Sequence, residues 1–256
     1  MNSSLQKWLR AASMGIALAV LGACSTGVGN PPVTGPAPAS AADAYAHSLY
    51  QSAMYEARHV LPLLPAVADA EGMVNVVSLK SAPWTVGDTT LTADVWVTVT
   101  PEVRDSCDDW VQAEQEMRLR QLLGLQPTQP VAYFMEMRVP ADSMFRPTAN
   151  PAIGTPTLCD TTVNPDCAIQ FSPNVNPRHV QWMAQQMLAS WKMPNGYPAS
   201  GDGEWQRLGY PWTRLGYTYN WHPGSPRYGA SEYVVRPGTR VAVTKVSTIA
   251  EYCRRG

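Results

Sequence analysis

Apolar residues recur at helical spacing in three stretches of the chain, 43–60, 106–124 and 176–194. The second stretch ends at Gly124, and glycine is the usual residue just beyond the last turn of a helix. The third stretch begins with Asn176 as its N-cap and has a proline at the first helical position. Its core-facing stripe is expected to consist of Val180, Met183, Ala184, Met187 and Trp191. The pattern therefore predicts about three helices.

Residues 91–100 show the alternation of apolar and polar residues that is typical of a half-buried strand. Further short strands are expected over 73–79, 131–139, 233–235 and 241–246. The last two flank Arg236–Thr239, where a proline followed by a glycine fits a type II turn, so we expect a closing hairpin. Strands and helices are interspersed, but the strands are few and several links are short. These features favour an α+β fold with a mainly antiparallel sheet over a doubly wound fold.

Two stretches have no periodic pattern. Residues 24–42 are rich in Gly, Pro, Ser and Ala and carry no charge, which is typical of a flexible tether. Residues 140–178 are rich in Pro, Asn and Thr, and an irregular stretch of this length is uncommon in a compact domain unless it is functional or pinned. We expect a single globular domain over 43–256 that contains this irregular segment, because a body of this size can bury about 70% of its unfolded surface.

The first 23 residues have the three parts of a secretory signal peptide. Lys7 and Arg10 supply positive charge, an apolar run extends to Val20, and small residues precede Cys24. The apolar run is too short to span a bilayer, which takes about 20 residues. Residues 21–24, with the sequence LGAC, resemble the lipobox of bacterial lipoproteins. The resemblance implies that the chain is cut before Cys24 and that this cysteine is lipidated.

The lipoprotein resemblance also implies a location. The Cys24 thiol would receive a diacylglycerol and its new amino group an acyl chain such as palmitate, and several acyl chains anchor a protein stably. In Gram-negative lipoproteins a residue other than aspartate after the cysteine, here Ser25, implies export to the outer membrane. Removing residues 1–23 takes away Lys7 and Arg10 and changes the net charge from −1 to −3, so a nucleic-acid partner is not indicated.

Four cysteines follow Cys24, and an even number in an exported chain indicates two disulfide bonds. Three pairings are possible. Closeness in sequence favours Cys159–Cys167, which leaves Cys107–Cys253 to tie the middle of the domain to its end. A metal site is the alternative, but the cysteine and histidine spacings do not match known zinc motifs. The sequence therefore predicts a domain braced by two disulfides.

Aromatic residues gather in residues 205–228, in a chain that has nine Trp and eleven Tyr against three Phe. Arginines and turn-forming glycines are interleaved with the rings. Since interface cores favour Trp, Tyr and Arg, this segment is a candidate binding surface. Its candidate residues are Trp205, Tyr210, Trp212, Arg214, Tyr217, Tyr219 and Trp221. The alternative is that the rings form the core of a sheet, because Tyr217, Tyr219 and Trp221 alternate with polar residues as on one face of a strand.

No motif in the sequence identifies a catalytic nucleophile, a metal site or a cofactor. There is no G-x-S-x-G elbow and no phosphate-binding loop, and the four histidines form no metal-binding pattern. Asp202 and Glu204 lie in an aromatic neighbourhood beside Trp205, and a pair of carboxylates is what glycoside cleavage requires. They are the candidates for hydrolysis.

Two functional hypotheses follow. The favoured one is non-enzymatic: an outer-membrane lipoprotein whose periplasmic or surface domain binds or braces another envelope component, either a protein or peptidoglycan or another carbohydrate. The second is a cell-wall or carbohydrate hydrolase that uses Asp202 and Glu204 in an aromatic cleft. Residues 118–124 and 210–221 also resemble segments of functionally uncharacterised secreted bacterial proteins, a resemblance that implies no activity.

Overall fold

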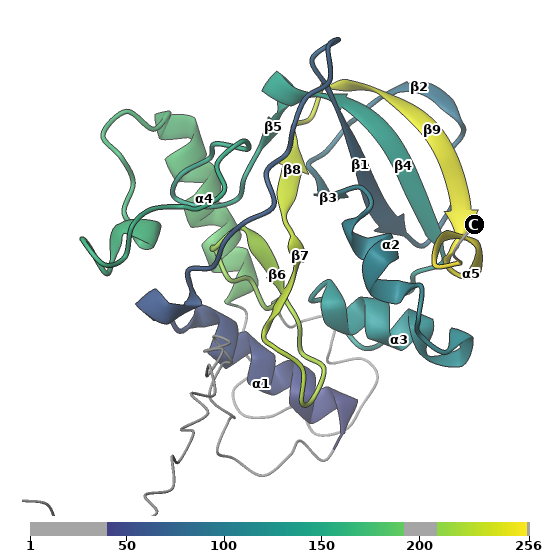
Figure 1. Cartoon of the computed structure of the whole chain (residues 1–256), viewed down its shortest axis with the longest axis horizontal. Helices are drawn as coiled ribbons and strands as arrows, with labels where there is room; N and C mark the ends of the chain where they lie inside the picture. The colour runs from purple at the N-terminus through teal and green to yellow at the C-terminus, as the bar shows by residue number, and fades with distance from the viewer. Residues whose placement is uncertain (1–39, 192–208, 255–256) are drawn as a thin grey trace, which may run out of the picture. The chain divides into compact units, whose positions relative to one another are not determined.

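The structure is a computed structural model of the chain, and it describes residues 40–191 and 209–254. All of the described residues belong to one compact unit, Pro32–Gly256 (Figure 1). None of the helices in this described part of the chain has the length and apolar character that crossing a membrane requires.

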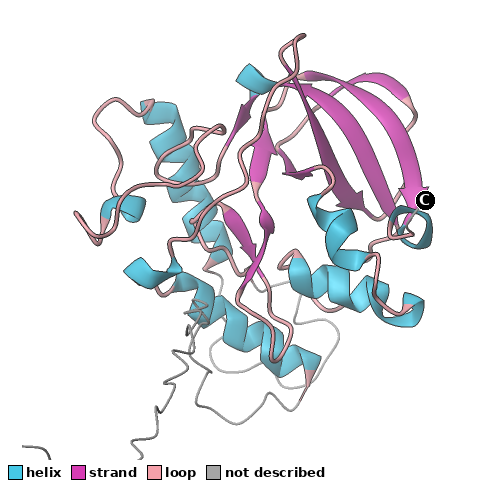
Figure 2. Cartoon of the chain, viewed as in Figure 1, coloured by secondary structure: helices cyan, strands magenta, loops and turns pink. Residues whose placement is uncertain are grey.

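The described residues form five α-helices, nine strands and three short 3-10 helices (Figure 2). The α-helices are α1 (Ala41–Ala53), α2 (Glu102–Cys107), α3 (Gln112–Leu122), α4 (Pro177–Ser190) and α5 (Ile249–Tyr252). The strands are β1 (Met73–Lys80), β2 (Gly87–Thr90), β3 (Val95–Val99), β4 (Tyr133–Pro140), β5 (Met144–Phe145), β6 (Tyr217–Tyr219), β7 (Tyr228–Ser231), β8 (Tyr233–Val235) and β9 (Arg240–Thr248). The 3-10 helices are η1 (Ala57–His59), η2 (Ala141–Ser143) and η3 (Cys167–Ile169).

Seven strands form one sheet in the order β2-β9-β4-β1-β3-β8-β5, and each neighbouring pair is antiparallel. β6 and β7 form a separate antiparallel pair. The prediction of an α+β fold with a mainly antiparallel sheet is therefore confirmed.

The large sheet curls round on itself. β2 and β3 follow one another in the chain, yet β2 lies at one end of the sheet and β3 in its interior. The ladder between β2 and β9 continues into the ladder between β3 and β8 through Leu91, whose N–H donates to the Thr239 carbonyl at 2.9 Å and whose carbonyl accepts from Gly238 N–H at 2.7 Å. Residues 87–99 and 233–248 thus run beside each other as two bent segments.

This pairing explains why the predicted hairpin is wrong. The turn at Arg236–Thr239 is present, with Gly238 at φ 81° as a type II turn requires. However, β8 pairs with β3 and β5, whereas β9 pairs with β2 and β4. The turn is a corner between two strands that pair with different neighbours, because the curled sheet offers each of them another partner.

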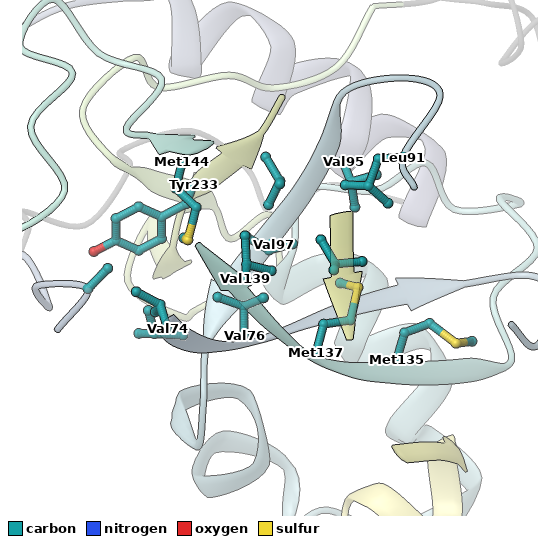
Figure 3. Close-up of a cluster of buried hydrophobic side chains, with 14 of the residues drawn as sticks. Val74, Val76, Leu91, Val95, Val97, Met135, Met137, Val139, Met144 and Tyr233 are labelled. Carbon is teal, nitrogen blue, oxygen red and sulfur yellow. The ribbon is translucent and has the colours of Figure 1, made fainter. Parts of the chain in front are cut away.

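The inner face of the curled sheet holds the largest core cluster (Figure 3). Alternate residues of the strands point into it, as the two-residue period of a strand requires. They include Val74 and Val76 of β1, Val95, Val97 and Val99 of β3, Met135, Met137 and Val139 of β4, and Val241 and Val243 of β9. We call this set the inner cluster.

The outer face of β1 and β4 packs against α2, α3 and α5. Val77 and Phe134 lie there with Val103, Leu119 and Tyr252, and the Phe134 and Tyr252 rings stack with their centroids 3.9 Å apart. The disulfide bond Cys107–Cys253 joins the end of α2 to the residue that follows α5, as the sequence predicted. The second predicted bond, Cys159–Cys167, closes a short loop in the irregular segment 140–178.

A buried arginine organises the same irregular segment. Arg146 is fully buried, and its guanidinium donates hydrogen bonds to the carbonyls of Ala152, Ile153 and Thr155. It also donates to the Tyr233 hydroxyl at 3.0 Å. These bonds tie the segment to β8, so its shape depends on a polar contact as well as on the Cys159–Cys167 bond.

The helices differ from the predictions in three respects, two of which concern their bounds and one a buried face. The stretch 106–124 contains two helices, because the chain turns after Cys107, where the disulfide bond fixes the end of α2; the predicted end at Gly124 is confirmed by its φ of 67°. The stretch 43–60 is α-helical only to Ala53, where the Arg214 guanidinium donates to the carbonyl of Ala53 at 2.7 Å and to that of Ser52 at 3.4 Å, and its later residues include the separate 3-10 helix η1.

The third difference concerns the buried face of α4. The Asn176 cap and the proline at its first position are confirmed. Of the predicted stripe, Met183 is buried, whereas Ala184 and Trp191 are exposed. The helix is turned because His179 and Trp182 pack edge-on against the Phe145 ring of β5, with centroids 5.3 and 4.7 Å from it.

Candidate ligand-binding cavity

A cavity of about 340 Å³ lies against the outer face of the large sheet. Its floor is formed by β1 and β3, with Phe134 of β4 and Glu232 just before β8. Its other walls come from Tyr45 of α1, Val103 of α2, Thr218 of β6, the loop that follows α3 and residues 209–211. Segments far apart in the sequence therefore converge on one site.

Aromatic rings form one wall of this cavity. The Trp96 and Tyr210 rings line it and meet edge to face, with their centroids 6.1 Å apart. Trp212 packs behind both of them, at 6.1 Å from Trp96 and 6.5 Å from Tyr210. Trp182 of α4 lies 5.9 Å from Trp96 on another side. The two rings that face the cavity are therefore held by a larger aromatic cluster.

Hydrogen bonds fix the orientation of this cluster. The Trp182 indole N–H donates to an Asp94 carboxylate oxygen at 2.7 Å, and the Tyr210 hydroxyl donates to the Gln186 side-chain oxygen at 2.9 Å. Both bonds tie α4 to the wall. On the opposite side, the Tyr45 hydroxyl donates to the Gly209 carbonyl at 3.0 Å and so connects α1 to the segment that contains Tyr210.

Glu232 is the acidic residue among the described residues of the lining, and only 8% of its surface is exposed. Tyr233 points to the inner face, so Glu232 points to the outer face by the alternation of a strand. The pairing of Val97 with Tyr233 places Thr98 level with Glu232. Burial raises the pKa of the Glu232 carboxyl well above its usual range.

Three buried polar atoms at this end of the cavity lack a hydrogen-bond partner among the described residues. They are Oε2 of Glu232, Oγ1 of Thr98 and Nε1 of Trp212, although the Trp212 N–H lies close enough to the Glu232 carboxyl to act on its pKa as a hydrogen-bond donor. Most buried polar groups in proteins are paired, and an unpaired one costs about 1–3 kcal/mol. A group of such atoms beside a cavity is therefore a feature that requires an explanation.

Lys80 also borders the cavity, but its charge lies elsewhere. Lys80 follows Leu79, which points to the outer face, so its side chain points to the inner side of the sheet. There its Nζ lies 5.6 Å from the centroid of the Trp84 ring, and Trp84 packs against the inner cluster. Burial lowers the pKa of Lys80. The charged side chain that faces the cavity from the described lining is thus that of Glu232.

The predicted aromatic binding segment divides between core and cavity. Trp212, Tyr217, Tyr219 and Trp221 are all buried, with 3–8% of their surfaces exposed. Tyr219 and Trp221 pack against Tyr45 and Leu49 of α1, as the alternative interpretation of these rings as core expects. Arg214 binds the end of α1, and Tyr210 is the ring of this segment that lines the cavity.

Four predicted site residues lie outside the described residues: Cys24, Asp202, Glu204 and Trp205. Two lining residues, Trp96 and Glu232, were not among the sequence candidates. The available signal for Glu232 was an acidic residue directly before the apolar strand Tyr233–Val235.

Other reactive residues have structural partners. The Ser231 hydroxyl and backbone N–H both donate to the Glu102 carboxylate, which links α2 to β7. His179 is buried with Nε2 at 2.8 Å from the Thr148 carbonyl oxygen, and burial lowers its pKa. Across the described ranges, no group of three or more His, Cys, Asp or Glu side chains is placed to hold a metal ion.

No protein-family model, curated protein or solved structure matches this chain.

Proposed function

We propose that the chain is a lipid-anchored lipoprotein of the bacterial outer membrane whose domain binds a small molecule, or a small chemical group of a larger envelope component, in the cavity beside Glu232. The anchoring rests on the LGAC sequence of residues 21–24, and the small-residue tether 24–42 would separate the domain from the membrane. Two disulfide bonds suit an oxidising compartment outside the cytoplasm.

One observation carries the binding function: a cavity of about 340 Å³ ends at buried polar atoms without partners. Small-molecule sites typically have volumes of about 300–1,000 Å³ and combine apolar walls with a few polar groups that orient the ligand. The aromatic wall and the Glu232 end correspond to these two parts. A ligand that bonds to Glu232 and Thr98 would supply the missing partners.

The anchoring is tested on the mature N-terminus. Mass spectrometry of the protein extracted from membranes should show a chain that begins with an acylated Cys24, and Cys24→Ala should prevent its recovery from the membrane fraction. Ser25→Asp should retain the protein in the inner membrane. A mature chain that starts at another residue and carries no lipid would contradict the proposal.

The cavity is tested with indole as a neutral probe on the mature chain carrying Cys24→Ala. Saturation-transfer NMR should detect indole binding to this protein, and Thr98→Phe should abolish it by filling the cavity. Val67→Phe is the matched control, because Val67 is 76% exposed and does not line the cavity. Gln129→Trp, at an exposed position of the lining, provides a second blocking variant should Thr98→Phe impair folding. Absence of indole binding to the unblocked protein would refute the proposed function.

A further inference from the structure

The charge of the cavity lining restricts the ligands that the cavity can accept. Glu232 has no ion-pair partner among the described residues, and the donor beside its carboxyl is the neutral indole N–H of Trp212. Arginine is absent from the described lining, and Lys80, which borders the cavity, has its Nζ 5.6 Å from the centroid of the Trp84 ring. Within the described lining, an anionic ligand would therefore meet an acidic group with no arginine beside it, whereas a cationic ligand would supply a counter-charge.

The aromatic wall has the same preference. The faces of Trp and Tyr rings carry partial negative charge and attract cations, most strongly where water is excluded. Trp96 and Tyr210 line the cavity, and their cluster is held in place by the bonds to Asp94 and Gln186. Cavities that combine aromatic rings with one carboxylate are suited to ammonium groups.

The arrangement of the unpartnered atoms points to a donor on the ligand. Oε2 of Glu232 and Oγ1 of Thr98 can both accept hydrogen bonds, and their residues are level on neighbouring strands. An ammonium group has two or three N–H donors and can serve both acceptors once the Glu232 and Thr98 side chains rotate toward the cavity, since both atoms are buried in the empty protein. A hydroxyl group has one donor, and a carboxylate has none.

We propose that the cavity binds an organic ammonium ion with an apolar body, whose N–H groups donate to the Glu232 carboxylate and the Thr98 hydroxyl while its apolar part lies against Trp96 and Tyr210. This inference rests on the proposed function and names the chemical class of its ligand. Glu232 binds the ligand as a carboxylate, so any proton that it carries in the empty cavity leaves for the solvent on binding.

The test compares three probes of similar shape that differ in charge: tryptamine, its neutral alcohol analogue tryptophol, and indole-3-acetate. Isothermal titration calorimetry on the mature chain carrying Cys24→Ala should give an affinity for tryptamine at least about tenfold above that for tryptophol, as expected for a charged hydrogen bond. Indole-3-acetate should bind more weakly than tryptophol. This comparison requires no change in the cavity.

The isosteric variant Glu232→Gln identifies the group responsible. It should reduce the tryptamine affinity to within about threefold of the tryptophol affinity and leave tryptophol binding unchanged. Glu71→Gln is the matched control, because the Glu71 side chain is 69% exposed and does not line the cavity, and it should change neither affinity.

The outcomes separate the two proposals. If indole and tryptophol bind but tryptamine binds no more tightly than tryptophol, the ammonium inference is overturned and the binding function stands. If tryptamine is preferred in Glu232→Gln as in the parent protein, Glu232 is not the counter-charge and the inference is also overturned. If none of the probes and no indole binds, the cavity is not a binding site and the proposed function fails first.

Discussion

The inner face of the large sheet is filled with valine, leucine and methionine side chains, whereas its outer face carries Glu232 and Thr98 beside a cavity. The polar group of the inner cluster, the Tyr233 hydroxyl, donates to the Leu64 carbonyl. On the outer face, the carboxyl and hydroxyl groups of Glu232 and Thr98 have atoms without partners in the described part of the chain. The two faces therefore differ in whether their polar atoms are satisfied.

This difference arises because different parts of the chain cover the two faces. The strands themselves enclose the inner face, since the sheet curls round it. The outer face near Glu232 is covered by a helix, loops and the β6–β7 pair, which come from separate parts of the sequence. Helix and loop segments packed on a sheet leave a cavity beneath them here, whereas the paired strands around the inner face enclose a filled core. We infer that the inner face provides stability and the outer face provides the site.

The largest expected effect on stability comes from the disulfide bond Cys107–Cys253 on the outer face of the sheet. Replacing Cys107 and Cys253 together by alanine should lower the free energy of unfolding by about 5 kcal/mol, because this bond spans 146 residues. Replacing Cys159 and Cys167, which are 8 residues apart, should cost about 2.5 kcal/mol. Urea unfolding under non-reducing conditions measures both losses. Equal losses would show that loop length does not determine the stabilisation.

Trp212→Ala should cost about 3–5 kcal/mol, since the ring is 3% exposed and packs behind the cavity wall. The matched control is Val67→Ala at an exposed position, which should change the free energy of unfolding by less than about 0.5 kcal/mol. Thermal and urea unfolding provide the measurement. A Trp212→Ala protein as stable as the control would return this ring to the candidate binding surface.

Neighbouring residues on opposite faces offer a direct comparison. Val97→Thr should cost about 1–3 kcal/mol, because it places a hydroxyl without a partner in the inner cluster. Thr98→Val should instead raise the free energy of unfolding by about 1 kcal/mol, because it removes an unpartnered hydroxyl. The same urea titrations measure both. Losses of similar size in the two variants would mean that the faces do not differ in polar satisfaction.

The smallest effect is a change in the pH dependence of stability. Burial raises the pKa of Glu232 above 4.5, so the folded protein holds a proton that the unfolded chain releases, and the contribution of this residue to stability falls as pH rises above 4.5. Glu232→Gln removes the effect. The Tm of Glu232→Gln minus the Tm of the parent protein should therefore increase as the pH is raised from 5 to 8.

The control for this titration is Val67→Ala, an exposed substitution that removes no ionisable group and should leave the pH profile parallel to that of the parent protein. Burial raises the pKa of Tyr210, the other ionisable group next to Glu232, so Tyr210 stays neutral over the range. A Glu232→Gln profile parallel to the parent profile would show that Glu232 is ionised in the folded protein at pH 5.

Local signals in the sequence predicted local features correctly. The Asn176 cap, the Gly124 helix end and the alternation in β3 all depend on interactions within a few residues, and each is present. The disulfide pairing also followed from counting and closeness. The hairpin prediction failed because the partner of a strand depends on the curvature of the whole sheet, which no local pattern records.

The site shows the same division. Tyr210 was among the candidates because it lies in a dense run of rings, but its neighbours Tyr217 and Trp221 proved to be core. Trp96 and Glu232 are 136 positions apart and meet only through the pairing of β3 with β8. Neither residue has a sequence neighbour that marks it as part of a site.

The sequence by itself determined the α+β class, two helix boundaries, the two disulfide bonds and the candidate export signal, because propensity, capping, alternation and cysteine count act over short distances or by composition. Only the tertiary structure decided which face of each element is covered, and by what. Glu232 is an ordinary acidic residue in the sequence, and it became a buried, unpaired carboxyl when α1, the loop after α3 and residues 209–211 closed over the outer face of the sheet. Burial arises from contacts between distant segments, and those contacts exist only in the folded chain.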